Sequence, residues 1–236
     1  MRRIRKLQGP EHFQRWKKGF QDLNGRPPLY DDLHHTEEYG RLRRALLKEQ
    51  GYICCYCERA IGRGCDKDHN IEHFMPRHPD RRVLTQAECD KCRDAQMDYT
   101  NLFVSCLGET ADTIDHCNHR KDNWFDFRLC VSPADEEIET LFGFRLNGKI
   151  FAIGSDVRAE AMKTHLNLGS YVLDEQRKAA YDTMMDIEFE NEELLGDTQY
   201  IMDTIEAYGQ MDGEGRYAPF CSMLTYCLEH ELLDPM

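Results

Sequence analysis

Residues 52–58 read Tyr-Ile-Cys-Cys-Tyr-Cys-Glu and set Cys54 and Cys57 in a C-x2-C pattern. Two thiolates at this spacing can hold one side of a tetrahedral zinc ion, so two further ligands must come from elsewhere in the chain. The candidate pairs are Cys106 with Cys117, which are ten residues apart, and a second C-x2-C pair, Cys89 with Cys92. The sequence therefore predicts a zinc-stabilised fold, and it leaves open whether the second C-x2-C pair binds the same zinc or another.

The distribution of cysteine supports a metal site rather than disulfides. Nine of the eleven cysteines lie between Cys54 and Cys130, and the basic N-terminus lacks the apolar stretch of a secretory signal. In a reducing cytosol such cysteines more often bind metal than form disulfides. The longest uncharged run, residues 217–228, is too short to span a bilayer, so we expect a cytoplasmic protein without a membrane partner. Three cysteines are expected to be buried small hydrophobes: Cys55, Cys221 and Cys227.

Charge divides the chain into two unequal parts. The net charge is −13, but residues 1–130 hold 23 basic and 21 acidic residues, whereas residues 131–236 hold 7 and 22. Contacts with an anion are therefore expected in the first part. The acidic second part is expected to face solvent or a basic partner.

Apolar residues at helical spacing predict helices in residues 1–51 and again after residue 155, where Ser155 and Asp197 are expected N-caps. Residues 144–151 carry Asn147-Gly148, which is typical of a β-hairpin with a type I′ turn. The intervening cysteine-rich part has few periodic segments and should need a metal to fold. We expect a mainly α protein with three parts: a helical segment at 1–51, a zinc-bound unit at 52–130, and an acidic helical domain at 131–236 with a hairpin near 144–152.

A second motif, Ile-Glu-His-Phe-Met-Pro at residues 71–76, places Glu72 beside His73. Neighbours in a strand point to opposite sides, so one side chain can bind a metal while the other approaches a water molecule. Two further stretches follow, Tyr-Thr-Asn-Leu-Phe-Val-Ser-Cys at residues 99–106 and Cys-Asn-His-Arg-Lys at residues 117–121. Each of them includes one of the candidate zinc ligands.

This ordered set, C-x2-C, Glu-His-x-x-Pro, Asn-Leu ending in Cys, and Cys-Asn-x-x-Lys, resembles the signature of HNH nucleases over about residues 52–125. The resemblance implies a zinc-bound ββα-metal core. It implies that His73 is the general base, that Glu72 and Asn118 hold a catalytic Mg²⁺ or Mn²⁺, and that Asn101 fixes the loop carrying the base. The structural zinc would be held by Cys54, Cys57, Cys106 and Cys117.

Two departures from the family pattern affect this assignment. The last cysteine pair is usually C-x2-C, and Glu72 stands where Asp or His is more usual, although a carboxylate still suits Mg²⁺. His119 is a second candidate for the role of Asn118. The residues next to the motifs that could contact phosphate are Arg77, Arg120 and Lys121.

The wider arrangement, with Leu166-Asn167-Leu168, resembles the PtuB-like HNH subunit of Septu-type and retron-associated antiphage defence systems. This resemblance implies an ABC/SMC-like ATPase partner and, in a retron, a reverse transcriptase complex. The alternative hypothesis is a zinc-stabilised, catalytically inactive binding or adaptor module, which would not need Glu-His-x-x-Pro together with Asn101 and Asn118. The sequence does not separate DNA from RNA as the nucleic acid substrate, because metal-assisted hydrolysis needs no 2′-hydroxyl.

Overall fold

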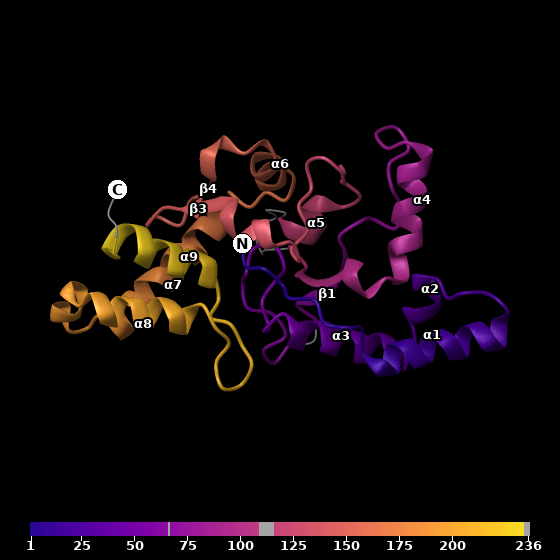
Figure 1. Ribbon diagram of the computed structural model, residues 1–236, viewed down its shortest axis with the longest axis horizontal. Coiled ribbons are helices and arrows are strands. Elements are labelled where there is room, and N and C mark those ends of the chain that lie inside the picture. The colour runs from indigo at the N-terminus through magenta and orange to yellow at the C-terminus, as the bar shows by residue number, and fades with distance from the viewer. Residues whose placement is uncertain (66, 109–115, 234–236) are drawn as a thin grey trace.

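A computed structural model describes residues 1–65, 67–108 and 116–233 (Figure 1). The described chain is mainly helical with two small antiparallel sheets, as the sequence predicted. The helices are α1 (Glu11–Asn24), α2 (Tyr30–Leu33), α3 (Glu37–Glu49), α4 (Gln86–Asp94), α5 (Cys117–Lys121), α6 (Val157–His165), α7 (Tyr171–Glu188), α8 (Thr198–Tyr208) and α9 (Cys221–Cys227). The strands are β1 (His69–His73), β2 (Leu102–Cys106), β3 (Phe142–Phe144) and β4 (Ile150–Ala152). None of the described helices combines the length and apolarity needed to cross a bilayer.

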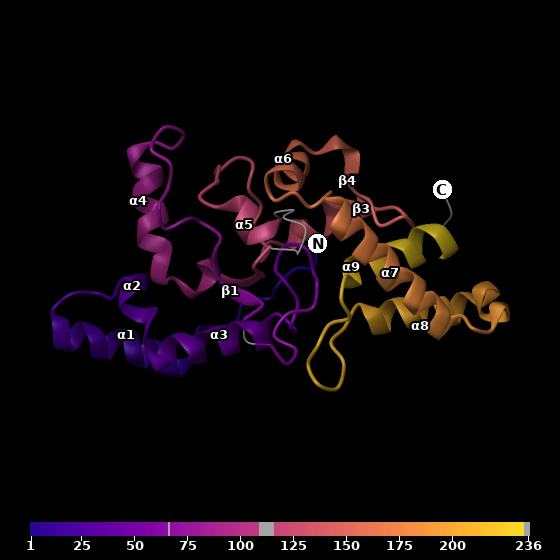
Figure 2. The same cartoon turned by 180° about the vertical axis from the view of Figure 1, so that it is seen from behind.

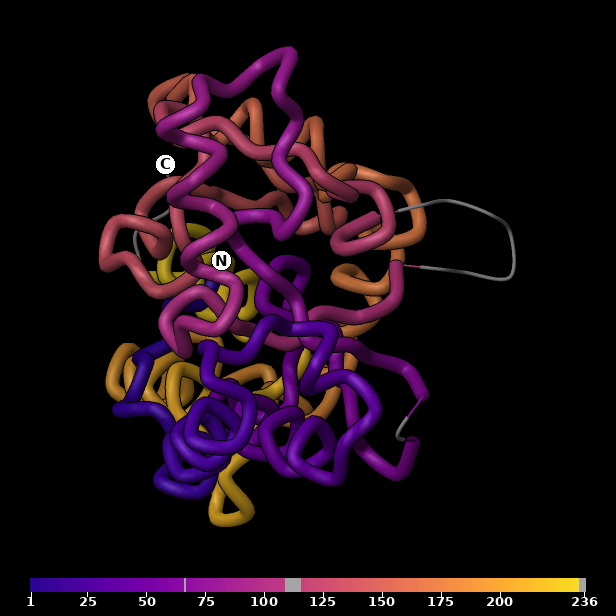
Figure 3. Tube along the Cα trace, turned by 90° about the vertical axis from the view of Figure 1, so that its right-hand side faces the viewer, coloured from indigo at the N-terminus to yellow at the C-terminus, as the bar shows by residue number. Residues whose placement is uncertain are grey.

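The molecule is elongated, with its N-terminal and C-terminal helices at opposite ends. Helices α1–α3 lie at one end and α7–α9 at the other, and the view from behind shows the same separation (Figures 1 and 2). Strand β1 and helix α5 lie between them (Figure 1), and Figure 3 views the chain along its longest axis. One hydrophobic core joins these parts, because Phe13, Phe103 and Leu224 belong to the same buried cluster. The three segments predicted from the sequence therefore share a core.

The central sheet pairs β1 with β2 in antiparallel register, with His73 opposite Leu102 and His69 opposite Cys106. All five residues of β2 are buried, and α5 packs against this strand. Along the chain α4 separates the two paired strands, and α5 follows β2, so the order is β1, α4, β2, α5. The end of α5 reaches the end of β1, because the Lys121 ammonium donates to the His73 carbonyl at 2.9 Å.

A buried glutamine fastens α3 to the central sheet. Gln50 Oε1 accepts a hydrogen bond from the Val104 amide at 2.6 Å, and its Nε2 donates to the carbonyls of Ile53 at 3.0 Å and Val104 at 2.9 Å. The side chain is 1% exposed. Gln50 thus provides hydrogen-bond partners for the backbone amide and carbonyl of Val104 at the free edge of β2. Water cannot take its place, because these groups are buried.

Replacing Gln50 with leucine should destabilise the protein by about 1–3 kcal/mol, the cost of leaving a buried backbone donor without a partner. Chemical denaturation measures this change. Gln21→Leu, at an exposed position on α1, is the control and should change stability by less than about 0.5 kcal/mol. Equal stability of the two variants would show that Gln50 does not hold the strand.

The predicted hairpin is confirmed, but its predicted turn type is wrong. Strands β3 and β4 pair with Phe144 opposite Ile150, and the Gly148 amide donates to the Arg145 carbonyl at 2.8 Å. A type I′ turn needs positive φ at both central residues. Here Gly148 has φ +81°, whereas Asn147 does not have a positive φ. The geometry is instead that of a longer loop closed by a left-handed glycine.

The two predicted N-caps had different outcomes. Asp197 caps α8 as expected, because its carboxylate accepts hydrogen bonds from the amides of Gln199 and Tyr200. Ser155 does not cap α6. Asp156 does so instead, through the amides of Arg158 and Ala159. A carboxylate one residue closer to the helix reaches these donors, and Ser155 takes a left-handed conformation with φ +56°.

Candidate metal centre and active site

Four cysteines from three separate elements meet in the core. Their sulfur atoms all lie within 4.8 Å of one another and all four residues are buried. Cys54 and Cys57 come from the loop after α3, Cys106 ends β2, and Cys117 begins α5. These are the four residues that the resemblance to HNH nucleases selects.

The geometry of this cluster fits a zinc ion. Four zinc–sulfur bonds of about 2.3 Å in a tetrahedron set the sulfurs about 3.8 Å apart. The Cys57 and Cys106 sulfurs are 3.8 Å apart. Burial raises the pKa of the Cys117 thiol well above its usual value, and a bound cation would offset the cost of ionising this thiol. A metal such as zinc therefore suits these donors.

Further residues surround the four cysteines, among them the Leu166-Asn167-Leu168 segment noted in the sequence. His116 is buried beside it, with Nδ1 3.2 Å from the Cys117 sulfur. The Cys117 amide donates to the Leu166 carbonyl at 2.9 Å, and Arg177 donates to the Leu168 carbonyl at 2.9 Å. The segment Leu166–Leu168 thus joins the metal centre to α7.

The second C-x2-C pair lies elsewhere. Cys89 and Cys92 are buried in α4, where they pack with Leu84 and Phe125 in a separate hydrophobic cluster. Within the described residues they do not join a metal-binding group. The C-x2-C spacing here corresponds to one turn of a helix rather than to a metal-binding loop. The three cysteines expected to be small hydrophobes are all buried: Cys55, Cys221 and Cys227.

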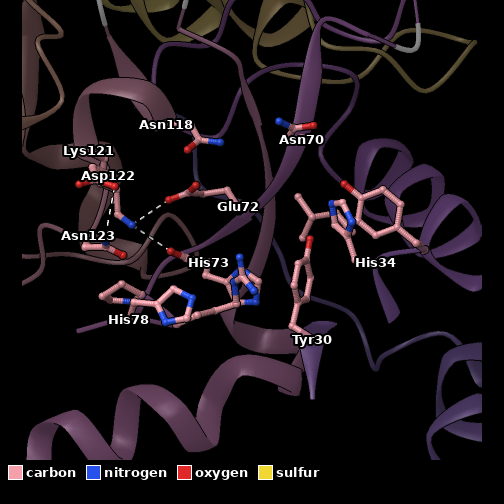
Figure 4. Close-up of a pocket in the computed structure, with 14 residues that line it drawn as sticks. Tyr30, His34, Asn70, Glu72, His73, His78, Asn118, Lys121, Asp122 and Asn123 are labelled. Atoms are coloured by element: carbon pink, nitrogen blue, oxygen red, sulfur yellow. Dashed lines mark hydrogen bonds and ion pairs between the residues drawn. The ribbon is translucent and has the colours of Figure 1, made fainter. Parts of the chain in front are cut away.

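A pocket of about 270 Å³ lies at the end of β1, between the N-terminal helices and α5 (Figure 4). Glu72, His73 and Asn118 all line it. The remaining lining residues are Tyr30, His34, Tyr39, Asn70, Ile71, Pro76, Arg77, His78, Lys121, Asp122 and Asn123. The fold therefore brings three predicted active-site residues from β1 and α5 to one cavity.

Glu72 is held from two sides. Its Oε1 accepts hydrogen bonds from the Tyr56 hydroxyl at 2.9 Å and from the Lys121 ammonium at 2.8 Å. Its Oε2 has no hydrogen-bond partner among the described residues. One carboxylate oxygen is thus fixed by the protein, and the other remains available to a cation in the pocket.

His73 is fixed in a defined tautomer. Its Nε2 lies 3.0 Å from the Gln96 carbonyl, and since a carbonyl only accepts, this nitrogen carries the hydrogen. Nδ1 is then the acceptor, and no described residue bonds to it. Burial lowers the pKa of His73 to about 3, so the imidazole is neutral at neutral pH.

Asn101 holds the backbone around His73. Its Oδ1 accepts from the Met75 amide at 2.7 Å, and its Nδ2 donates to the carbonyls of Met75 at 3.1 Å and Ala95 at 3.2 Å. The residue is 3% exposed. Asn101 thereby joins the loop after His73 to the turn that presents the Gln96 carbonyl.

The structure distinguishes between Asn118 and His119, the two candidate metal ligands on α5. Asn118 lines the pocket, and its side chain makes no hydrogen bond to the described residues. His119 is exposed and does not line the pocket. The pocket therefore favours Asn118 as the second oxygen donor beside Glu72.

The expected phosphate contacts differ in position. Lys121 is 3% exposed, and its ammonium also donates to the His73 carbonyl at 2.9 Å. Arg77 lines the pocket but pairs with Asp31 at 2.7 Å. Arg120 is exposed and lies outside the pocket lining. Lys121 thus supports Glu72 and β1 instead of standing free for phosphate.

Three residues of this site were not predicted from the sequence: Tyr56, Gln96 and Tyr30. Tyr56 lies between the two cysteines of the first C-x2-C pattern, which was its only sequence signal. Gln96 acts through its backbone carbonyl, which no side-chain motif reveals. Tyr30 packs its ring edge-on against His73, with ring centroids 4.4 Å apart.

Comparison with known proteins gives one informative similarity. No protein-family model matches the chain. A protein of Escherichia coli named "Retron Ec83 putative HNH endonuclease" is 26% identical over 113 residues, which is 47% of this chain and 39% of that protein. The chain thus matches well under half of this relative's length. The similarity supports a relationship to HNH endonucleases and, weakly, nuclease activity.

Proposed function

We propose that the protein is a metal-dependent HNH endonuclease that hydrolyses phosphodiester bonds in nucleic acid. The observation that carries this proposal is the placement of two free acceptor atoms, His73 Nδ1 and Glu72 Oε2, on adjacent residues at one pocket. Adjacent residues of a strand point to opposite faces, and at the end of β1 both of these side chains line the same pocket. A base and a metal ligand can therefore act on opposite sides of one reacting phosphate.

His73 is the general base in this mechanism. Its neutral imidazole takes a proton from the attacking water at Nδ1, while the Gln96 carbonyl holds Nε2–H and keeps the ring oriented. A positioned base of this kind contributes on the order of 100- to 10,000-fold in rate. Asn101 keeps the surrounding backbone in place and is a positioning residue.

Glu72 and Asn118 are the proposed ligands of the catalytic cation. Mg²⁺ and Mn²⁺ prefer oxygen donors, and one or two protein oxygens with substrate phosphate and water are a usual Mg²⁺ environment. When bound, such a cation stabilises the negative charge that develops on phosphate. Tyr56 and Lys121 hold the opposite oxygen of Glu72 and so fix the direction of the free one.

The cysteine cluster has a structural role in this proposal. Its sulfur atoms are buried within 4.8 Å of one another, and Cys117 begins the helix that carries Asn118. A zinc ion bound there would fix α5 against β2, and therefore Asn118 against Glu72. The arrangement of two strands and a helix supports assignment to the ββα-metal core.

The inactive adaptor is the less supported alternative. An adaptor has no need to hold a neutral imidazole and a carboxylate with one free acceptor each at the same cavity. Burying such polar groups costs free energy unless they are fully bonded. The presence of all these groups at one pocket favours catalysis.

The proposal also includes a role in defence and a protein partner. The relative's name places it in a retron, and the acidic residues 131–236 suit a basic surface on another protein. The ABC/SMC-like ATPase, the reverse transcriptase complex and the Septu-type assignment remain predictions from the resemblance.

The replacement of Glu72 with glutamine tests the metal site and the nuclease function together. Wild-type protein should cleave plasmid DNA, single strands or RNA only when Mg²⁺ or Mn²⁺ is added. Glu72→Gln should raise the Mg²⁺ concentration for half-maximal cleavage by about tenfold or more, since even indirect support of a metal ligand is worth about 10- to 100-fold. Glu175→Gln, at an exposed position on α7, is the control. Metal-independent cleavage, or an unchanged Mg²⁺ requirement in Glu72→Gln, would contradict the proposal.

A further inference from the structure

We propose that Tyr39 and His34 form a stacking surface for one unpaired nucleobase next to the phosphate that is cleaved, which makes the substrate a single strand or an unpaired nucleotide. This inference rests on the proposed nuclease function and adds the class of substrate. Tyr30, His34 and Tyr39 are called the aromatic wall below.

The aromatic wall lies opposite the polar side of the pocket. Its members come from α2, the residue after it, and the first turn of α3, all in the N-terminal helical segment. Figure 4 shows Tyr30 and His34 on one side of Glu72 and His73, and Lys121, Asp122 and Asn123 on the other. A phosphate bound near Glu72 would therefore have the aromatic wall as one of its neighbours.

The three rings support one another from the inside outwards. Tyr30 is 4% exposed and packs edge-on against His73. The Tyr39 ring contacts Tyr30 with centroids 6.3 Å apart, and the His34 ring contacts Tyr39 with centroids 5.0 Å apart. Tyr39 is half-buried and His34 is exposed. The outer two rings are thus fixed from behind and open to a ligand.

The charges in the pocket favour stacking as a source of affinity. Of the cations that line it, Lys121 is paired with Glu72 at 2.8 Å and Arg77 with Asp31 at 2.7 Å. The net charge of −13 adds no general attraction for a polyanion. Stacking of bases on aromatic side chains supplies affinity without positive charge and tolerates any base.

Base pairing decides which nucleic acid can use this surface. In a duplex the neighbouring base pairs cover both faces of each base, so aromatic side chains stack only on unpaired bases. The pocket volume of about 270 Å³ is slightly below the range of roughly 300–1,000 Å³ for sites that enclose a drug-sized ligand. We therefore expect it to hold a single nucleotide.

Binding of oligonucleotides that contain 2-aminopurine tests this inference without relying on cleavage. This base analogue loses fluorescence when it stacks, so single-stranded DNA and RNA carrying it are titrated with the full-length protein in the absence of added Mg²⁺. Wild-type protein should quench the fluorescence and bind single strands more tightly than the same sequence as a duplex. Tyr39→Leu and His34→Ala should each weaken binding by about 5- to 150-fold and reduce quenching.

Three variants separate stacking from other effects. Tyr39→Phe keeps the ring and should bind as wild type. His35→Ala removes a ring that contacts His34, with centroids 4.7 Å apart, but does not line the pocket, and Tyr171→Ala removes an exposed tyrosine of α7. Both should bind as wild type. If Tyr39→Leu fails to fold, the quenching and affinity measured for His34→Ala decide the result, because His34 is exposed.

The possible outcomes distinguish this inference from the proposed function. Unchanged quenching and affinity in His34→Ala, or tighter binding of duplex than of single strands, would overturn the stacking surface even if the protein cleaves nucleic acid. Quenching that depends on the aromatic wall, in a protein that cleaves no nucleic acid with Mg²⁺ or Mn²⁺, would support the surface and refute the nuclease. A difference between the DNA and RNA arms identifies which of the two the pocket accepts.

Discussion

Cys106→Ser is expected to remove the bound metal and to abolish cooperative folding of the central part of the protein. Cys106 joins the end of β2 to the cysteine cluster. Structural zinc contributes an apparent free energy of about 10–16 kcal/mol in zinc-finger peptides, whereas the net stability of a whole protein is about 5–15 kcal/mol. Elemental analysis of protein purified without added metal should give one zinc per wild-type cluster and none for the variant. Thermal unfolding should show the accompanying loss of stability.

Cysteines outside the cluster provide the controls for this experiment. Cys65→Ser changes an exposed thiol and should leave both metal content and melting temperature unaltered. Cys89 and Cys92 lie in α4, outside the cysteine cluster. The variants Cys89→Ser and Cys92→Ser should therefore keep the zinc, although each places a hydroxyl in a buried hydrophobic cluster. Loss of zinc from the α4 variants together with its retention in Cys106→Ser would show that the ligands have been wrongly assigned.

The grouping of the four cysteines could be predicted because a tetrahedral ion imposes a pattern on the sequence. A C-x2-C pair leaves half of the coordination sphere open, and the ordered motifs select Cys106 and Cys117 as the other half. Spacing alone did not exclude Cys89 and Cys92. The same i, i+3 spacing occurs on one face of a helix, and only the fold shows that α4 carries it.

The surroundings of the candidate active site could not be predicted in the same way. Lys121 and Glu72 belong to different motifs, and the sequence offered Lys121 as a phosphate contact, whereas the fold buries its ammonium against the carboxylate. Tyr30 lies in a segment whose apolar spacing indicated only a helical scaffold. Contacts such as Tyr30 with His73 depend on how α2 packs against β1, and this packing leaves no local pattern.

His73→Ala should lower the cleavage rate on the order of 100- to 10,000-fold while zinc content stays the same. In the proposed mechanism the imidazole supplies the proton acceptor, and it lies outside the cysteine cluster, so its loss should remove the chemistry and leave a zinc ion bound by the cysteines in place. Single-turnover cleavage at saturating Mg²⁺ measures the chemical step, and elemental analysis measures the zinc.

A second substitution separates the role of base from the role of support. His73→Ala leaves the Gln96 carbonyl without its donor, which alone could disturb the turn near Asn101. His73→Gln keeps an N–H group that can reach this carbonyl but offers no basic nitrogen. It should therefore be as inactive as His73→Ala and closer to wild type in thermal stability. Recovery of activity by His73→Gln would mean that His73 orients the site without accepting a proton, and full activity of His73→Ala would exclude it as the base.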